Sequence, residues 1–256
     1  MNLLCNVKAK TVKMAGIEVS QVAFGTEHIN QYATDFGGKL LRDAAIDHNV
    51  FFWDTDNEYG SQPQVACGLK LVERDKVVIC SKTYANTAKE AEEDFHRILC
   101  DLKTDYLDIC LLHFVSDERF AICRGALEFL QKMKKQKLIR RVGLSTHSND
   151  VAWKASDLKE IDIICVTLNR DGSRIDGKGN AQGQIAALQK AHAKGIGTYV
   201  IKVLGRGDLL YDMKAAMHWV MENHKYIDVY NIGFSNIREL SQDVKIVNDY
   251  YEERGL

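Results

Sequence analysis

Apolar runs and amphipathic segments alternate along almost the whole chain. Short runs of continuous or alternating hydrophobicity predict strands at residues 20–25, 50–54, 76–81, 106–112, 140–145, 161–167, 196–203 and 227–232. Between them, apolar residues recur at helical spacing near residues 38–48, 62–73, 87–101, 118–137, 149–158, 181–194, 211–224 and 236–251. The pattern therefore predicts eight strands that alternate with eight helices.

This alternation indicates an α/β protein with right-handed crossovers and a parallel sheet. Eight strand–helix units favour a sheet that closes into a (β/α)8, or TIM, barrel over an open, doubly wound sheet. Before the first barrel strand, residues 9–24 have the pattern of a β-hairpin that turns at Ala15-Gly16. We expect this hairpin to close the floor of the barrel.

Composition limits the number of domains and the kinds of partner. The 256 residues contain no Pro/Ser-rich linker and no shift in composition, which indicates a single domain over residues 1–256. Acidic and basic residues are interleaved, and the formal net charge is -1. A basic surface for nucleic acid or for a membrane is therefore not expected.

The N-terminus and the cysteines bear on location. Residues 1–8 lack the apolar region of a signal peptide, and no stretch of the chain has the roughly 18 apolar residues that span a bilayer. The seven cysteines contain no CxxC motif and lie mostly within apolar runs, which is typical of reduced thiols. We therefore expect a cytoplasmic protein without a metal site, and the oligomeric state stays open.

Titratable side chains follow three consecutive predicted strands. Asp54, Lys82 and His113 each come at or directly after the end of an apolar run, and Tyr59 lies in the loop that follows Asp54. In a closed barrel, the carboxyl ends of all strands lie at the same rim, where functional side chains usually gather. We therefore expect Asp54, Tyr59, Lys82 and His113 to meet in one site.

These residue types suit proton transfer to a carbonyl group. A phenol and an amine both titrate near about pH 10, so neither exchanges protons readily at neutral pH. We expect Lys82, kept cationic by Asp54, to lower the pKa of Tyr59 toward neutrality. Tyr59 could then protonate a carbonyl oxygen as it becomes an alkoxide, while His113, neutral or cationic, donates to the same oxygen. The hydride must come from a cofactor, and nicotinamide is the natural choice.

The segments that carry these residues resemble the aldo-keto reductases. The resembling segments follow one another in order over nearly the whole chain: Val19–Thr26, Trp53–Thr55 with Tyr59-Gly60, Ser81-Lys82, Asp105–His113, Arg141–Ser145 and Val203–Leu209. The resemblance implies that NAD(P)H binds over the carboxyl-terminal rim without a Rossmann domain. It also implies NADP(H) or NAD(H) as cofactor, with NADP(H) slightly preferred, and a small carbonyl compound or alcohol as substrate.

The resemblance also assigns roles to individual residues. It implies that Tyr59 donates the proton, that Lys82 and Asp54 adjust the pKa of Tyr59, and that His113 orients the substrate. The positions that it implies for cofactor binding are Gly25, Thr26, Asp54, Ser145, Lys202, Leu204, Gly205, Gly207, Ser235 and Asn236.

Some positions depart from the family pattern. Thr146 stands where an asparagine usually holds the nicotinamide amide, Cys165 stands in place of a glutamine, and Ile201 in place of an aromatic residue. Residues 233–236 lack the basic side chain that typically binds the adenosine 2′-phosphate, and Arg238 lies out of register. These changes bear on cofactor binding and leave the proton chemistry intact.

Two other functions stay open. The altered positions on the nicotinamide side are also compatible with a cofactor-sensing or regulatory protein of the same fold with little turnover. Alternatively, Lys202 could form a Schiff base with a carbonyl substrate, as in a lyase, if its pKa is depressed. The lyase hypothesis leaves the grouping of Asp54, Tyr59 and Lys82 unexplained.

Overall fold

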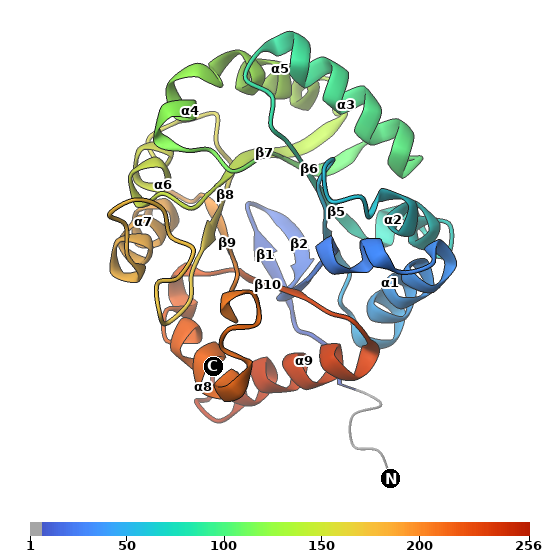
Figure 1. Ribbon diagram of the computed structural model, residues 1–256, viewed down its shortest axis with the longest axis vertical. Helices are drawn as coiled ribbons and strands as arrows, with labels where there is room; N and C mark the ends of the chain where they lie inside the picture. The colour runs from blue at the N-terminus through green and yellow to red at the C-terminus, as the bar shows by residue number, and fades with distance from the viewer. Residues whose placement is uncertain (1–6) are drawn as a thin grey trace.

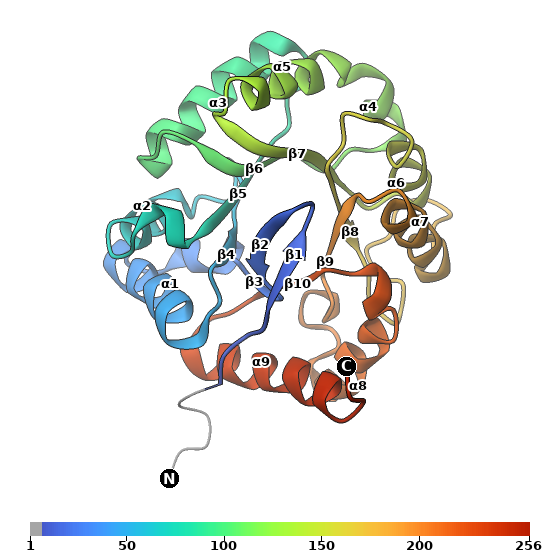
Figure 2. The same cartoon turned by 180° about the vertical axis from the view of Figure 1, so that it is seen from behind.

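The computed structural model describes residues 7–256. Its parallel strands are β3 (Val22–Gly25), β4 (Phe52–Asp54), β5 (Val78–Thr83), β6 (Leu107–Leu112), β7 (Ile139–Thr146), β8 (Ile163–Thr167), β9 (Gly197–Ile201) and β10 (Val229–Gly233). They close into a barrel in the order β10-β3-β4-β5-β6-β7-β8-β9 (Figures 1 and 2). The predicted (β/α)8 barrel is confirmed.

The helices surround the barrel (Figures 1 and 2). They are α1 (Thr34–His48), α2 (Gln62–Leu69), α3 (Ala88–Leu102), α4 (Asp117–Ile122), α5 (Arg124–Lys135), α6 (Asn149–Ala155), α7 (Ala181–Ala193), α8 (Met213–Met221) and α9 (Ile237–Glu252). Short 3-10 turns are η1 (Glu27–Gln31), η2 (Arg74–Lys76), η3 (Gly205–Gly207), η4 (Leu210–Asp212) and η5 (His224–Tyr226). Local sequence sets several starts; Thr87 and Glu90, for example, form a capping box that begins α3.

The helix predicted over residues 118–137 is in fact two helices, which meet at Cys123. On α4, the Arg119 side chain donates to the backbone oxygen of Tyr84 at 2.7 Å and holds α4 against the rim loops. On α5, a Cβ at Gly125 would lie 3.2 Å from the first backbone nitrogen of α3. The two halves thus pack against different neighbours, and the chain bends between them.

The predicted hairpin consists of β1 (Thr11–Met14) and β2 (Ile17–Ser20), which pair in antiparallel fashion. Its turn is Ala15-Gly16, whose φ angles of 47° and 78° are both positive. Positive φ at both central residues is the backbone that a type I′ hairpin turn requires. The hairpin covers one end of the barrel, as the view from behind shows (Figure 2).

The hairpin also fills the barrel from below. Met14 and Ile17 are buried among inward-facing strand side chains such as Phe52 and Tyr199. The hairpin can lie this close to β9 only because residue 197 is a glycine: a Cβ at Gly197 would lie 2.7 Å from Met14 Cγ. Because side chains pack the interior and the hairpin closes the floor, the opposite rim is left for ligands.

Three further features concern the described part of the chain. No helix in residues 7–256 is long and apolar enough to cross a membrane. The cysteines within this range are free thiols. Nor do three or more His, Cys, Asp or Glu side chains in it gather in an arrangement that could bind a metal ion. The prediction that the N-terminus is not a signal peptide concerns residues that lie largely outside this range.

Candidate active site

Asp54, Tyr59, Lys82 and His113 lie together at the carboxyl-terminal rim. In the parallel register, Asp54 at the end of β4 is opposite Cys80 on β5, two residues before Lys82. The Lys82 Nζ atom lies 5.0 Å from the centroid of the Tyr59 ring. The centroids of the Tyr59 and His113 rings are 5.8 Å apart. The structure therefore places the predicted phenol, amine and imidazole within one small volume.

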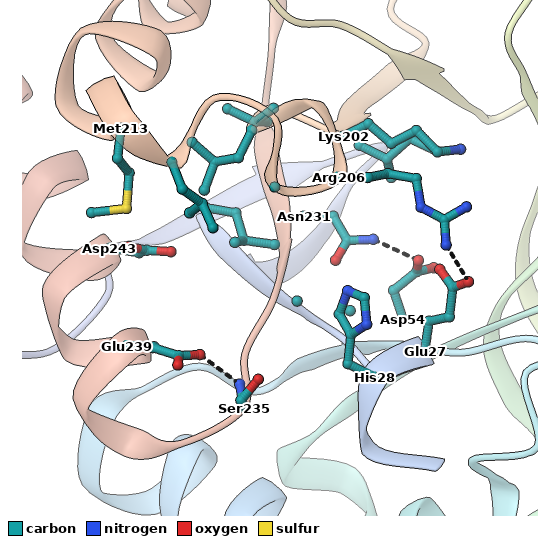
Figure 3. A pocket seen from close by; sticks show the side chains of 18 of the residues that line it. Glu27, His28, Asp54, Lys202, Arg206, Met213, Asn231, Ser235, Glu239 and Asp243 are labelled. Atoms are coloured by element: carbon teal, nitrogen blue, oxygen red, sulfur yellow. Dashed lines mark hydrogen bonds and ion pairs between the residues drawn. The ribbon is translucent and has the colours of Figure 1, made fainter. Parts of the chain in front are cut away.

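Asp54 is the centre of a buried hydrogen-bond network. Its Oδ2 atom accepts from Lys82 Nζ at 2.9 Å. The same atom accepts from Asn231 Nδ2 at 2.6 Å (Figure 3). Its Oδ1 atom accepts from the Tyr199 hydroxyl at 3.0 Å. Lys82 donates a second hydrogen bond to the backbone oxygen of Thr55 at 2.7 Å. The side chains of Asp54 and Lys82 are only 2% and 1% exposed, so each charge depends on the other for compensation.

Sequence analysis did not identify Asn231 and Tyr199 as parts of this network. Asn231 is a polar residue inside the otherwise apolar strand β10, and this interruption is a signal that could have identified it. Tyr199 gives no such signal, because a tyrosine in a buried strand is ordinarily explained by packing. Its partner Asp54 is 145 residues away, and closure of the barrel brings the two together.

The expected fall in the pKa of Tyr59 is not found. Burial raises the pKa of the Tyr59 phenol above its ordinary value, and the opposing charge of Lys82 only partly offsets this. Burial also lowers the pKa of the Lys82 amine, but Asp54 and other neighbours together outweigh it, so the net pKa is well above the usual value. Tyr59 is therefore a protonated phenol beside a permanent cation.

His113 lies against Asp56, which sequence analysis also did not identify. The Nδ1 atom of His113 is 2.6 Å from the Oδ2 atom of Asp56. Burial lowers the pKa of the imidazole, and the contact with Asp56 counteracts part of that shift. On the other side, the centroid of the Tyr84 ring is 4.5 Å from that of His113.

A cavity of about 570 Å³ opens beside Asp54 and Tyr59 (Figure 3). Its walls come from η1, the segment after β9, the end of β10 and α9. The predicted cofactor-binding residues that line the cavity are Gly25, Asp54, Lys202, Leu204, Gly207 and Ser235. The predicted residues that do not line it are Thr26, Ser145, Gly205 and Asn236.

The side chains of Thr26, Ser145 and Asn236 bond to the protein itself. Thr26 Oγ1 donates to a backbone oxygen of β4 at 3.2 Å. Ser145 Oγ accepts from the backbone nitrogen of Phe114 at 2.9 Å, and Asn236 Oδ1 accepts from that of Glu239 at 3.0 Å. These three residues stabilise the loops and helix end that frame the cavity.

Of the positions that depart from the family pattern, Thr146 and Cys165 are buried in the protein, whereas Ile201 lines the cavity. Thr146 Oγ1 donates to the backbone oxygen of Val115 at 2.7 Å and is fully buried. Cys165 lies inside the barrel, where burial raises the pKa of its thiol to about 12. Because this thiol is also fully buried, we do not expect it to act as a nucleophile. Ile201 lines the cavity directly.

Lys202 and Arg206 contribute positive charge to the cavity. The Lys202 Nζ atom lies 2.7 Å from Nε2 of His147. Burial lowers the pKa of Lys202 to about 8 and that of His147 to about 3, so the lysine holds the proton. Arg206 donates to Glu27 at 3.1 Å across the cavity mouth (Figure 3).

Helix α9 contributes carboxylates to the cavity wall. Glu239 and Asp243 line the cavity, whereas Arg238 does not and points to solvent. Glu239 accepts from the backbone nitrogen of Ser235 at 2.8 Å. Sequence alone did not predict that Glu239 and Asp243 face the cavity, because the side of α9 that faces it is set by how the helix packs on the barrel.

Asp243 should make the stability of the protein fall as pH rises. Burial raises the pKa of this 5% exposed carboxyl to about 7, with a further contribution from Glu239. In an unfolded chain, an aspartic acid loses its proton with a pKa of about 3.9. Between this pH and the folded-state pKa of about 7, the folded protein therefore binds one more proton than the unfolded chain. The free energy of unfolding should therefore decrease with rising pH, by at most about 1.4 kcal/mol per pH unit from this group.

Asp243→Asn removes this titration and tests the assignment. We expect the variant to be more stable than wild type near about pH 8, with a difference that shrinks toward about pH 5. Urea unfolding at a series of pH values measures both effects. Parallel pH profiles for the two proteins would contradict the prediction.

Comparison with known proteins agrees with the geometry. The family model for the Aldo/keto reductase family matches residues 21–252. An NAD(P)H-dependent D-xylose reductase from Candida tenuis is 33% identical over 78 residues, which cover 27% of this chain and 24% of that enzyme. The chain thus matches about a quarter of the length of this curated relative.

Solved structures share the fold over nearly the whole chain. One from Pseudomonas aeruginosa, described as an aldo-keto reductase, has a TM-score of 0.82 at 22% identity and covers 98% of this chain and 99% of its own. An aldo-keto reductase from Klebsiella pneumoniae in complex with NADPH has a TM-score of 0.74 at 19% identity, covering 94% and 90%. At these identities the structures establish the barrel alone. The family match over residues 21–252 establishes more: this protein belongs to the Aldo/keto reductase family.

Proposed function

We propose that this protein is an NAD(P)H-dependent oxidoreductase that reduces an aldehyde or ketone to an alcohol, or catalyses the reverse reaction. One observation carries the proposal: a buried Lys82–Asp54 ion pair lies against the Tyr59 ring at the edge of a cavity. This arrangement presents a proton donor whose conjugate base has a cation beside it. Membership of the family and the NAD(P)H-dependent relative support the same reaction class.

The cavity fits a nicotinamide dinucleotide in size and chemistry. Its volume of about 570 Å³ falls within the range of about 300–1,000 Å³ that is typical of cofactor sites. Lys202 and Arg206 would hold the pyrophosphate by charge. The bound cofactor supplies the hydride for the carbonyl carbon.

The residues of the chain then provide the proton and its control. Tyr59 delivers its proton to the carbonyl oxygen, and the charge of Lys82 stabilises the tyrosinate that remains. Because burial raises the pKa of Tyr59, the phenol keeps its proton until a strongly basic alkoxide forms next to it. Asp54 holds Lys82 in place, and His113 orients the oxygen.

Cofactor binding followed by a turnover assay tests this proposal. We would titrate the protein with NADPH and with NADH by fluorescence, and then assay a panel of aldehydes, ketones and aldoses. Saturable binding and carbonyl-dependent oxidation of the reduced cofactor are expected. Failure to bind either cofactor would contradict the proposed function.

A regulatory protein of the same fold is the second candidate. It is favoured by Thr146, whose hydroxyl donates to the backbone oxygen of Val115 and accepts from the backbone nitrogen of Ser148, which leaves it engaged within the protein and not with a nicotinamide amide. Tight cofactor binding with no turnover of any carbonyl would support this candidate. The lyase hypothesis depends on Lys202, whose lowered pKa is compatible with an imine. Borohydride trapping without an adduct on Lys202 would exclude it.

Glu239→Gln should improve the binding of NADPH more than that of NADH. Glu239 lines the cavity through α9, and the other acidic side chain that α9 places there, Asp243, holds its proton over much of the acidic range because burial raises its pKa to about 7. NADPH carries an additional phosphate, so removal of one negative charge should favour it by about 1 kcal/mol, or roughly fivefold in Kd. Equilibrium titration with both cofactors measures the ratio. Arg238→Gln, at a neighbouring position outside the cavity, is the control. If wild type, Glu239→Gln and Arg238→Gln all have the same ratio of the Kd for NADH to the Kd for NADPH, the prediction is contradicted.

A further inference from the structure

Asp56 and His113 form a buried pair that the reaction described above does not yet use. The Asp56 Oδ2 and His113 Nδ1 atoms are 2.6 Å apart, and both are buried. Within residues 7–256, neither atom has a third group as hydrogen-bond partner, and their own contact is close in distance but not aligned as a hydrogen bond. The second oxygen of Asp56, Oδ1, accepts from the backbone nitrogen of Glu58 at 2.8 Å, which fixes the carboxylate in the loop.

Two aromatic rings pack against the imidazole ring of His113. The ring of Tyr59 meets it edge-on at 76°, and that of Tyr84 is tilted by 41°. The Arg119 guanidinium donates to the backbone oxygen of His113. Although Nδ1 is buried, the side chain of His113 remains 11% exposed, so the part of the ring away from Asp56 reaches the rim.

A carboxylate oxygen offers only lone pairs, and a lone pair on His113 Nδ1 only 2.6 Å away would be repelled by it, so this nitrogen carries the hydrogen. A neutral imidazole has one hydrogen in total, and here it belongs on Nδ1. Nε2 is then a lone-pair acceptor in the neutral ring and becomes a donor only when the ring is cationic. Sequence analysis left both charge states of His113 open as donors, and the position of Asp56 distinguishes them.

We propose that Asp56 is a positioning residue: it keeps the proton of neutral His113 on Nδ1, so that Nε2 donates to a carbonyl oxygen only from the imidazolium. The inference rests on the carbonyl reduction proposed above and adds a direction to it. The cationic ring favours reduction, because it stabilises the developing alkoxide. The neutral ring cannot stabilise the alkoxide in this way, because its Nε2 has only a lone pair, and in the reverse reaction the one hydroxyl hydrogen of the alcohol passes to Tyr59.

The tautomer of His113 can be measured directly and without turnover. Long-range ¹H–¹⁵N spectra of the protein labelled at histidine distinguish a neutral ring protonated on Nδ1 from one protonated on Nε2. The His113 signals are assigned by their loss in His113→Asn. We expect Nδ1–H in wild type and a substantial Nε2–H population in Asp56→Ala. A wild-type ring protonated on Nε2 would overturn the proposal, even if the variant fails to fold.

Glu58→Gln is the matched control for charge. Glu58 lies two residues from Asp56 in the same loop, is 60% exposed and is paired with Arg97 at 3.6 Å, away from His113. Its removal eliminates the same charge from the loop but leaves the contact with Nδ1. The Glu58→Gln spectrum should match that of wild type. A tautomer that is unchanged in a folded Asp56→Ala would overturn the proposal.

The pH profile then tests the consequence for the reaction. The groups that face the ring are Asp56, Asp54, Lys82, Tyr59 and Tyr84, with His147 farther along the rim. In wild type, kcat/KM for carbonyl reduction should fall about tenfold per pH unit once His113 loses its proton.

In Asp56→Ala, the fall of kcat/KM with rising pH should become shallower, because a neutral His113 ring can then donate from Nε2. Superimposable profiles would overturn the proposal. If wild type reduces no carbonyl at all, the proposed function fails, whereas the spectra still decide whether Asp56 sets the tautomer.

Discussion

Replacing Tyr59 with phenylalanine is expected to lower kcat for carbonyl reduction by about 10²–10⁴-fold, the usual contribution of a positioned general acid. Tyr59→Phe removes one oxygen atom and leaves the ring against Lys82 and His113. The cofactor Kd should therefore change little, because the ring still lines the cavity. Steady-state kinetics together with a fluorescence titration separate the two effects.

Tyr211→Phe is the control for loss of a tyrosine hydroxyl. Tyr211 is 78% exposed, and its hydroxyl accepts from Arg170 at 3.0 Å, so its removal should leave kcat within about twofold of wild type. If Tyr59→Phe reduces carbonyls as fast as Tyr211→Phe, Tyr59 is not the proton donor.

Lys82→Met should lower the free energy of unfolding by about 3–5 kcal/mol, the usual result when one partner of a buried ion pair is removed. The variant leaves Asp54 2% exposed without its cation. The hydrogen bonds from Tyr199 and Asn231 remain, but neither donor carries a charge. Urea unfolding of the ligand-free protein measures the loss.

A double variant and a surface pair make this prediction specific. Asp54→Leu combined with Lys82→Met removes both charges, and we expect it to be more stable than Lys82→Met alone. At the exposed pair of Lys245 and Asp249, 2.7 Å apart, Lys245→Met should change the free energy of unfolding far less than Lys82→Met does. Equal destabilisation by Lys82→Met and Lys245→Met would show that burial of the pair contributes nothing.

The fold was largely predictable because its signals are local. Each barrel strand is an apolar run, and each surrounding helix repeats apolar residues with a period that is visible in a short window. The Ala15-Gly16 turn also follows from its glycine, which adopts positive φ without a steric cost, whereas Ala15 adopts it less readily. The error at residues 118–137 arose because an unbroken helical pattern does not reveal that α4 and α5 pack against different neighbours.

The site was predictable only where function leaves a polar residue at a strand end. Asp54, Lys82 and His113 meet that description, and the structure brings them together with Tyr59. Most of the predicted cavity residues also line the cavity. By contrast, Thr26, Ser145 and Asn236 bond to the protein itself, since a hydroxyl or amide in a loop has many potential partners.

The sequence by itself determined the barrel, the hairpin at its floor and the kinds of group that gather at its rim, because those depend on periodicity and on strand ends. The tertiary structure alone decided how those groups are tuned. Burial raises the pKa of Tyr59 in spite of Lys82, and Asp56 faces Nδ1 of His113. A pKa and a tautomer depend on solvent exclusion and on atoms a few ångströms away, and closure of the barrel sets both.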